Sequence, residues 1–179
     1  FKNSIFNGNQ RGGLAFGSEW GKGEVHNIEI TGCEIKDNSH HSLLLWFDTP
    51  YSGINIHHNR IIHTGDDIAL VGLLSGTQNL PDNWWGCNEG FDQPGCAWGQ
   101  WALTGSFAFP SHLVMNVSTD TPFTPGGTST FTADLTYNNL GVDTSDDGDP
   151  LTTDDGHLPP ATVSFTPIDH VTPDTALLA

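Results

Sequence analysis

The sequence predicts an all-β protein, in which a right-handed parallel β-helix of about three coils precedes an incomplete immunoglobulin-like β-sandwich. Three observations lead to this fold class: apolar residues alternate in short runs, the runs recur every 26 to 30 residues, and turn-forming residues separate them. The 21 Gly and 11 Pro interrupt the chain too often for long helices, and no window carries sustained apolar positions at helical spacing.

The repeat becomes visible when residues 3–16, 33–46 and 59–72 are aligned. The alignment superposes apolar residues at two positions, namely Ile5, Ile35, Ile61 and Leu14, Leu44, Leu70. It also equates Ile28 and Ile30 with Ile54 and Ile56. Because such short strands cannot bury a face alone, we expect successive coils to stack in parallel around one core. Cys33 aligns with a turn position, which predicts a small buried residue.

Residues 1–105 are predicted to form the β-helix, closed at its C-terminal end by a cap rich in Trp and Cys. The Gly- and Pro-rich loop between Cys87 and Cys96 is typical of a disulfide in an oxidising compartment, although a reduced pair also fits the sequence. An open β-helix end exposes core and strand edges, so a cap is the expected role for this segment. A platform of tryptophans for sugar stacking is the competing interpretation.

Residues 106–179 are rich in Thr, Ser, Pro and Asp, and they alternate as strands do. Their composition and turn spacing suit an immunoglobulin-like sandwich. The segment is shorter than the roughly 100 residues that such a domain normally needs. We therefore expect a sandwich that is truncated or completed by another segment or subunit.

The net charge of −16 is unevenly distributed, since all five basic residues lie within the first 60 positions. Residues 61–179 carry fifteen carboxylates and no Lys or Arg. Such a surface repels phosphate backbones and anionic lipid head groups, which argues against nucleic-acid binding and electrostatic membrane binding. The apolar runs are too short for a transmembrane segment. The chain reads as an excerpt from a longer protein.

Four segments together resemble large repeat-containing surface proteins of prokaryotes, often from methanogenic archaea, which place parallel β-helix repeats before immunoglobulin-like modules. The segments are Asn83–Gly90, Pro94–Cys96, Pro125–Ser129 and Thr132–Thr136. The resemblance implies secretion, attachment to the cell surface, and a role in adhesion or envelope structure. It implies no particular ligand.

A catalytic alternative starts from Asp66 and Asp67, which resemble the acidic motif of polygalacturonase-type glycoside hydrolases. Paired carboxylates can supply the acid and the base for glycosidic cleavage. The alignment places His41 and Arg11 on successive coils beside Asp67. The family's further acidic residue one coil earlier is missing, however, as are its later Gly-His-Gly and Arg-Ile-Lys motifs. Gly-Asp-Asp also suits a simple turn.

Two further candidate sites lie in the second half of the chain. Six aspartates within 13 residues predict a Ca²⁺ site, because like charges at this density repel one another unless a hard cation neutralises them; they are Asp143, Asp146, Asp147, Asp149, Asp154 and Asp155. A solvated acidic loop explains them equally well. Asn116 opens the sequon Asn-Val-Ser and is a candidate glycosylation site.

Taken together, these features predict an extracellular, non-enzymatic structural or adhesive component of a cell envelope, sheath or filament. Its expected partners are neighbouring copies or other modules of the same surface protein, which dock by strand addition. The alternative is a carbohydrate-active enzyme or a carbohydrate-binding protein that uses the flank of the β-helix.

Overall fold

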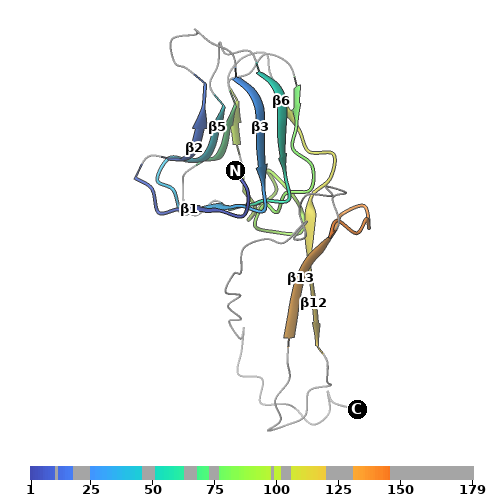
Figure 1. Ribbon diagram of the computed structural model, residues 1–179. Helices are drawn as coiled ribbons and strands as arrows, with labels where there is room; N and C mark the ends of the chain where they lie inside the picture. The colour runs from blue at the N-terminus through green and yellow to red at the C-terminus, as the bar shows by residue number, and fades with distance from the viewer. Residues whose placement is uncertain are drawn as a thin grey trace, which may run out of the picture. The chain divides into compact units, whose positions relative to one another are not determined.

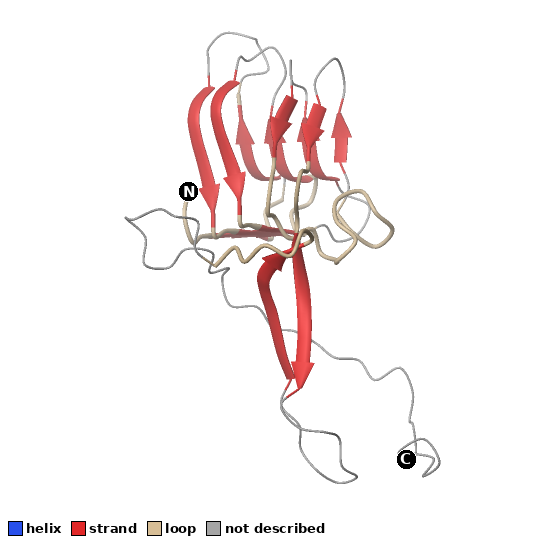
Figure 2. Cartoon of the chain, turned by 90° about the vertical axis from the view of Figure 1, so that its right-hand side faces the viewer, coloured by secondary structure: helices blue, strands red, loops and turns tan. Residues whose placement is uncertain are grey.

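The computed structural model describes residues 1–10, 12–17, 25–45, 51–62, 68–72, 77–97, 99–101, 106–119 and 131–145. Within these ranges all regular secondary structure is β, with no helix, and the strands do not close into a barrel (Figure 2). The predicted all-β class is therefore confirmed. A search of the same residues for a helix long and apolar enough to cross a membrane finds none.

The described residues form thirteen short strands, which are separated by turns (Figure 1). They are β1 (Ile5–Asn7), β2 (Gly12–Phe16), β3 (Val25–Thr31), β4 (Glu34–Lys36), β5 (His41–Leu45), β6 (Tyr51–His57), β7 (Arg60–Ile61), β8 (Ile68–Gly72), β9 (Thr77–Asn79), β10 (Gly99–Trp101), β11 (Ser106–Ala108), β12 (Leu113–Thr119) and β13 (Phe131–Asn138).

The strands pair in parallel with strands of the preceding and following repeats. The sheets have the orders β1-β4-β7, β2-β5-β8-β10, β3-β6 and β9-β11, and all their pairings are parallel. Five successive passes of the chain, called coils here, take part: residues 1–17, 25–45, 51–72, 77–101 and 106–113. Each coil lies against the next, so the backbone groups of one coil find partners in its neighbours.

A continuous apolar core fills the interior of the stacked coils. Ile30, Ile35, Leu43, Ile56 and Ile61 are fully buried in it. In-register pairs align these side chains across neighbouring coils, for example Ile30 with Ile56 and Ile35 with Ile61. The alternating β-branched residues of the sequence thus form columns, and burying them removes apolar surface from water.

The predicted register of the strands is wrong by one residue in two places. Phe6, and not Ile5, pairs with Ile35, and Ile5 remains 56% exposed. Leu43, and not Leu44, pairs with Leu14 and with Leu70. Because successive strand residues point to opposite faces, a shift of one position exchanges the core face for the outer face. The pairing of Ile35 with Ile61, and of Ile28 with Ile54, is as predicted.

The parallel pairing crosses residue 105, where the sequence places the end of the β-helix. β11 pairs with β9, and a parallel bridge joins Asn83 to His112. β12 and β13 then form a separate two-stranded sheet, and their arrows point in opposite directions (Figure 2). The chain divides into two compact units, Phe1–Met115 with Leu135–Pro159, and Asn116–Asp134 with Pro160–Ala179. The division into two domains at residue 105 stays a prediction.

Candidate functional site

One corner of the stack repeats the same tight turn in four coils, and we call it the tight corner. Asn3, Gly32, His58 and Asp82 occupy it with φ values of 48°, 63°, 53° and 50°. Such left-handed backbone is unfavourable for most residues, so stacking must stabilise it at His58. The N–H of Gly32 donates to His58 O at 3.0 Å, and that of His58 to Asp82 O at 2.9 Å.

A ladder of polar side chains runs beside this turn, which we call the tight-corner ladder. Asn59 Oδ1 accepts the N–H of Cys33 at 3.0 Å, and Asn83 Oδ1 accepts the N–H of Asn59 at 3.0 Å. Asn59 Nδ2 donates to Ile30 O, and Asn83 Nδ2 donates to Ile56 O. All three ladder residues are fully buried, which such groups tolerate only when they are hydrogen-bonded. The prediction that Cys33 is a small buried residue is confirmed.

The last rung of this corner is supplied by the end of β13 and the residue that follows it. The N–H of Asn139 donates to His112 O at 2.8 Å, and the N–H of His112 donates to Asn139 Oδ1 at 2.9 Å. Asn138 Nδ2 donates to Asp82 Oδ1 at 2.9 Å. The chain thus returns to the tight corner after its excursion through β12 and β13. The sequence contained no signal for this return.

A second ladder joins the first two coils at the opposite end of β1 and β4. Asn38 Oδ1 accepts the N–H of Asn9 at 3.1 Å and its Nδ2 at 2.8 Å. Asn38 Nδ2 donates to Phe6 O at 3.1 Å. The sequence alignment placed Cys33 and Asn59 at one turn position where polar side chains stack, which agrees with the tight-corner ladder. It missed the ladder between Asn9 and Asn38, although an Asn that recurs near the repeat period was a readable signal.

A buried ion pair connects the second and third coils next to the tight corner. Arg60 donates to Glu34 Oε2 through Nε at 2.6 Å and also through Nη2, and Lys36 Nζ lies 3.0 Å from Glu34 Oε1. Glu34 is 4% exposed and Arg60 is 6% exposed. The two residues are directly in register in β4 and β7. The sequence signal for this pair was two opposite charges one repeat apart, and this signal was overlooked.

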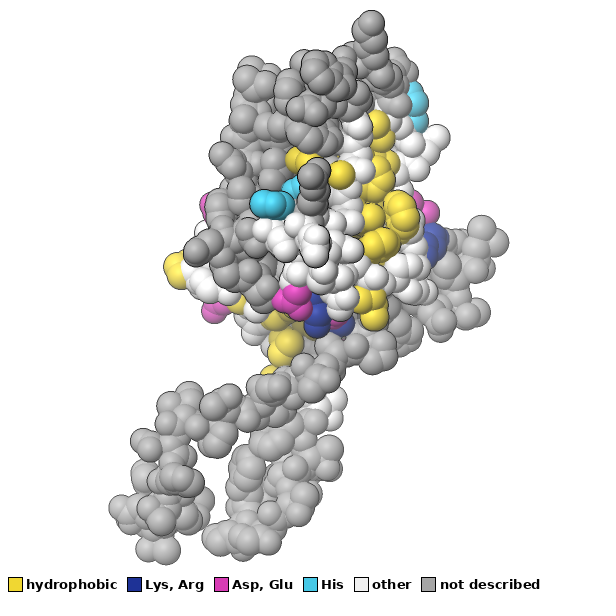
Figure 3. All heavy atoms as spheres, turned by 90° about the vertical axis from the view of Figure 1, so that its left-hand side faces the viewer, with side chains coloured by type: hydrophobic (Ala, Val, Ile, Leu, Met, Phe, Trp, Pro, Cys, Tyr) yellow, Lys and Arg dark blue, Asp and Glu magenta, His cyan; other side chains and the backbone are white. Residues whose placement is uncertain are grey.

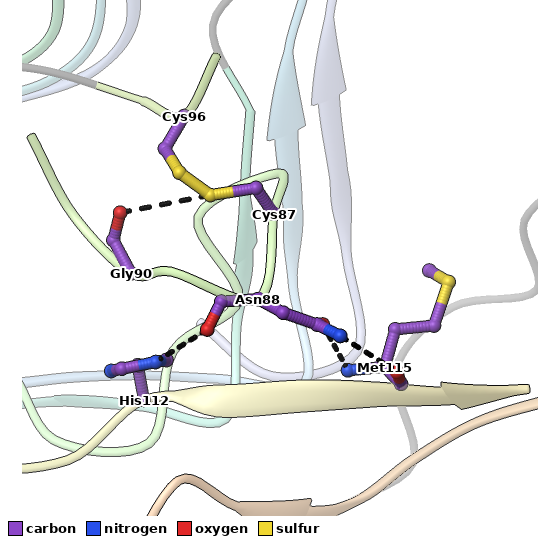
Figure 4. The surroundings of a disulfide bond; sticks show 6 residues. All are labelled: Cys87, Asn88, Gly90, Cys96, His112 and Met115. Atoms are coloured by element: carbon purple, nitrogen blue, oxygen red, sulfur yellow. Dashed lines mark hydrogen bonds between the residues drawn. A yellow bond between two sulfur atoms is a disulfide. The ribbon is translucent and has the colours of Figure 1, made fainter. Parts of the chain in front are cut away.

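The structure joins Cys87 and Cys96 in a disulfide, and the loop between them contacts the fifth coil (Figure 4). Asn88 Oδ1 accepts the N–H of Met115 at 2.7 Å, and Asn88 Nδ2 donates to Met115 O at 3.0 Å. His112 Nε2–H donates to Asn88 O at 2.9 Å. The side chain of Asn88 therefore pairs with the start of β12 as a neighbouring strand would.

The first two tryptophans of this segment are core residues. Trp84 is 5% exposed, and Trp85 is fully buried. Trp85 packs edge-on against Phe91 and Phe109, whose rings stack on each other at 4.2 Å. A buried ring cannot stack on a sugar, so Trp84 and Trp85 offer no carbohydrate platform. The side chains of Trp98 and Trp101 lie outside the described part of the chain.

Of the alternative catalytic set, the structure describes only His41, because Arg11, Asp66 and Asp67 lie outside the described residues. His41 pairs with Gly12 and with Ile68, one position away from the predicted alignment with Arg11 and Asp67. Burial and, to a smaller extent, the neighbouring His40 lower the pKa of His41. A Cβ on Gly12 would overlap the imidazole ring. This contact gives His41 a packing role against the first coil.

Of the predicted calcium ligands, only Asp143 is described; Asp146, Asp147, Asp149, Asp154 and Asp155 lie outside the described residues. Asp143 Oδ1 accepts hydrogen bonds from the hydroxyl and the N–H of Ser145, and these bonds lower the pKa of the Asp143 carboxyl. The group Cys87, Glu89 and Cys96 is close enough for a metal, but both sulfurs belong to the disulfide. Calcium binding stays a prediction.

Asn116, the candidate glycosylation site, lies in β12 and is exposed. Exposure is necessary for modification of the side chain, and it is not sufficient. Glycosylation at Asn116 therefore stays a prediction.

Comparison of the chain with protein-family models, with curated proteins and with solved structures finds no match. The interpretation of function consequently depends on the geometry described above.

Proposed function

We propose that the chain belongs to an extracellular, non-enzymatic surface protein, and that it combines a right-handed parallel β-helix with an incomplete immunoglobulin-like sandwich. The β-helix part is supported by parallel pairing through five coils and by two ladders. The sandwich part is supported by the separate β12–β13 sheet. The handedness of the coils and the completion of the sandwich belong to the proposal.

The observation that carries this proposal is the use made of buried polar side chains. The side-chain amides of Asn59, Asn83 and Asn38 hydrogen-bond to neighbouring coils. The carboxylate of Glu34 pairs with Arg60 and Lys36. A catalytic site needs polar groups that remain available to a substrate. The buried polar groups described here hold one coil to the next, which is the requirement of a rigid scaffold.

The extracellular location is supported by the disulfide between Cys87 and Cys96, since disulfides persist mainly in oxidising compartments. The acidic composition suits a saline exterior as well. In a cell envelope, sheath or filament, such a scaffold would contact neighbouring copies or modules of the same protein.

Two measurements on the native protein test this location. An antibody against the chain should label intact source cells and lose its signal after external protease treatment, while a cytoplasmic marker resists. Alkylation under denaturing conditions should modify one of the three cysteines before reduction and all three after it. Labelling only after lysis, together with three free thiols, would refute the extracellular assignment.

The carbohydrate-active alternative has its own test. The chain is incubated with a panel of polysaccharides, and reducing ends and unsaturated products are measured for the wild type and for Asp66→Asn and Asp67→Asn. We expect no product above the level of the variants. Turnover that is lost in both variants would replace the structural role with a hydrolase or a lyase.

Calcium at the Asp143–Asp155 segment is part of the proposal as a surface cation site. Titration calorimetry with Ca²⁺, followed by chelation, tests it. Absence of heat and an unchanged melting temperature would remove calcium and leave a solvated acidic loop.

A further inference from the structure

In the described part of the chain, the first coil lies at one end of the stack. β1 and β2 are terminal in their sheets, and among the described residues each pairs on one side only, with β4 and with β5. Phe1 and Lys2 continue the edge beside β3 through the bridge from Lys2 to Thr31. A terminal strand offers unpaired N–H and C=O groups to a further strand.

The edge is also apolar where the core columns end. Figure 3 looks onto this side of the molecule, and hydrophobic side chains form a band across it. Phe1 is 55% exposed, and its ring lies edge-on against Phe6 at 5.5 Å and against Phe16 at 6.1 Å. In the second coil the residues paired with Phe6 and Phe16, Ile35 and Leu45, are fully buried. A further coil would bury the first coil in the same way.

The hydrogen bonds of the two ladders follow one rule. This rule says which backbone groups a further coil would have to offer. In each rung, Asn Oδ1 accepts the N–H of the equivalent residue in the preceding coil, and Nδ2 donates to the C=O three residues before it. Asn59 does so with Cys33 and Ile30, and Asn83 does so with Asn59 and Ile56.

The same hydrogen-bond rule holds between the second and the first coil, and within the described ranges the series ends at Asn9. Asn38 bonds to Asn9 and to Phe6 in the same manner. Asn9 itself is exposed, and among the described residues it bonds only to Asn38 and Ser39 of the second coil; none of these hydrogen bonds reaches Asn9 Oδ1. By the same rule, Asn9 Oδ1 would accept an N–H from a preceding coil, and Asn9 Nδ2 would donate to the carbonyl three residues earlier in it.

We propose that the edge formed by β1, β2 and Asn9 is a docking surface for one further coil of the same repeat, running parallel to the first coil. The proposal rests on the β-helix part of the proposed function. The occupant is argued from continuity, since the strand pairings between neighbouring coils are parallel and the ladder rule holds at three successive contacts, from the first coil to the fourth. A second copy meeting the edge head-to-head would present antiparallel strands, and the ladder rule requires parallel ones.

The test uses a labelled synthetic peptide with the sequence of the second coil, residues 25–45, carrying Cys33→Ser to remove the thiol. If the peptide adopts the parallel register, its Ile35 covers Phe6, its Leu43 covers Leu14, and its Asn38 N–H meets Asn9 Oδ1. We expect saturable binding by fluorescence anisotropy. Asn9→Ala should weaken it about tenfold, which corresponds to the loss of one or two hydrogen bonds. Asn55→Ala, at an exposed asparagine of the third coil that lies outside this edge and outside both ladders, is the matched control and should bind as the wild type does.

Three results would overturn the proposal. The first is no binding of the peptide while hydrogen exchange still finds the amides of Leu43 and Leu45 protected, which would leave the stacked fold intact and remove only the docking edge. The second is equal binding of a scrambled peptide. The third is a concentration-dependent dimer of the chain that Asn9→Ala abolishes, which would make a second copy the occupant. Loss of amide protection itself would instead count against the β-helix of the proposed function.

Discussion

The stack has two corners beside the β1-β4-β7 sheet, and they are built differently. The tight corner keeps two residues between strands in the second and third coils, Gly32–Cys33 and His58–Asn59. The opposite corner, which we call the variable corner, has four residues in each of the first two coils, 8–11 and 37–40, six in the third, 62–67, and a disulfide-bridged insertion in the fourth.

The difference teaches that a side-chain ladder survives only where the corner length is constant. At the variable corner the ladder from Asn9 to Asn38 joins two corners of equal length. It has no counterpart among the described residues beyond the second coil, where the corner lengthens. At the tight corner the ladder continues from Cys33 to Asn83. Where the insertion interrupts the repeat, a disulfide closes the loop, and Asn88 contacts the chain beyond it through His112 and Met115.

The largest expected effect breaks the tight-corner ladder. Asn59→Ala removes the bonds to Cys33, Ile30 and Asn83 and leaves buried backbone groups unpaired. Each buried unpaired group costs about 1–3 kcal/mol, so we expect about 3 kcal/mol of lost unfolding free energy in urea titrations. Asn55→Ala, exposed in the same coil, should change it by less than about 0.5 kcal/mol.

Asn9→Ala tests the variable corner in the same assay. Asn9 is exposed, and Asn38 Oδ1 keeps the N–H of residue 9 as a donor. We expect a loss of about 0.5–1 kcal/mol. A loss equal to that of Asn59→Ala would remove the proposed difference between the corners.

The next effect concerns the buried ion pair beside the tight corner. Arg60→Met leaves the Glu34 carboxylate buried with Lys36 alone, and we expect a loss of about 2–3 kcal/mol, somewhat below that of a buried charge with no partner. Adding Glu34→Leu should recover most of it, because an apolar pair needs no solvation. Lys2→Met breaks the exposed pair with Glu29 and should cost at most about 1 kcal/mol. If Lys2→Met lowers the unfolding free energy as much as Arg60→Met does, burial does not explain the contribution of the Glu34–Arg60 pair.

A smaller effect probes the docking of the insertion. Gly90 and Gly95 have φ values of 90° and 85°, so alanine strains both backbones alike. A Cβ at Gly90 would lie 2.8 Å from His112 Cε1, and at Gly95 it would meet nothing within 4 Å. We expect Gly90→Ala to cost about 1–2 kcal/mol more than Gly95→Ala in thermal melts. Reduction of the disulfide should shrink this difference; equal losses before reduction would mean that the loop does not rest on His112.

The smallest expected effect is a dependence of stability on pH. It arises from His41 at the start of β5, just after the variable corner. Because burial lowers the pKa of His41, the unfolded chain binds a proton more readily than the folded chain. The folded protein should therefore lose stability as the pH falls below about 6.5, the ordinary value for histidine, and the loss should level off below the folded pKa. His41→Gln should flatten this part of the melting temperature profile. A profile identical to that of the wild type would assign the dependence to another group.

Much of the fold was predictable because alternation and repeat are local properties of the sequence. Ile28 and Ile30 fall exactly one repeat before Ile54 and Ile56, so their pairing followed from spacing alone. The register at Ile5 was wrong because an alignment on residue type cannot choose between adjacent apolar residues. Phe6 is the better core residue only because the turn before it starts one position later, at Asn3 with a φ of 48°.

The sequence by itself determined the all-β class and the short repeat pattern, since both depend on nearby residues. It favoured a disulfide between two cysteines nine residues apart and left a reduced pair open, and the structure has the disulfide. Tertiary structure alone decided that Glu34 meets Arg60, that Asn88 pairs with Met115, and that Asn139 returns to His112. These contacts join residues 26 or 27 positions apart. Glu34 meets Arg60 because the coil length sets which residue of the next coil lies opposite, and a change of one residue would select a different partner. Asn139 meets His112 only because the chain returns to the tight corner after β12 and β13.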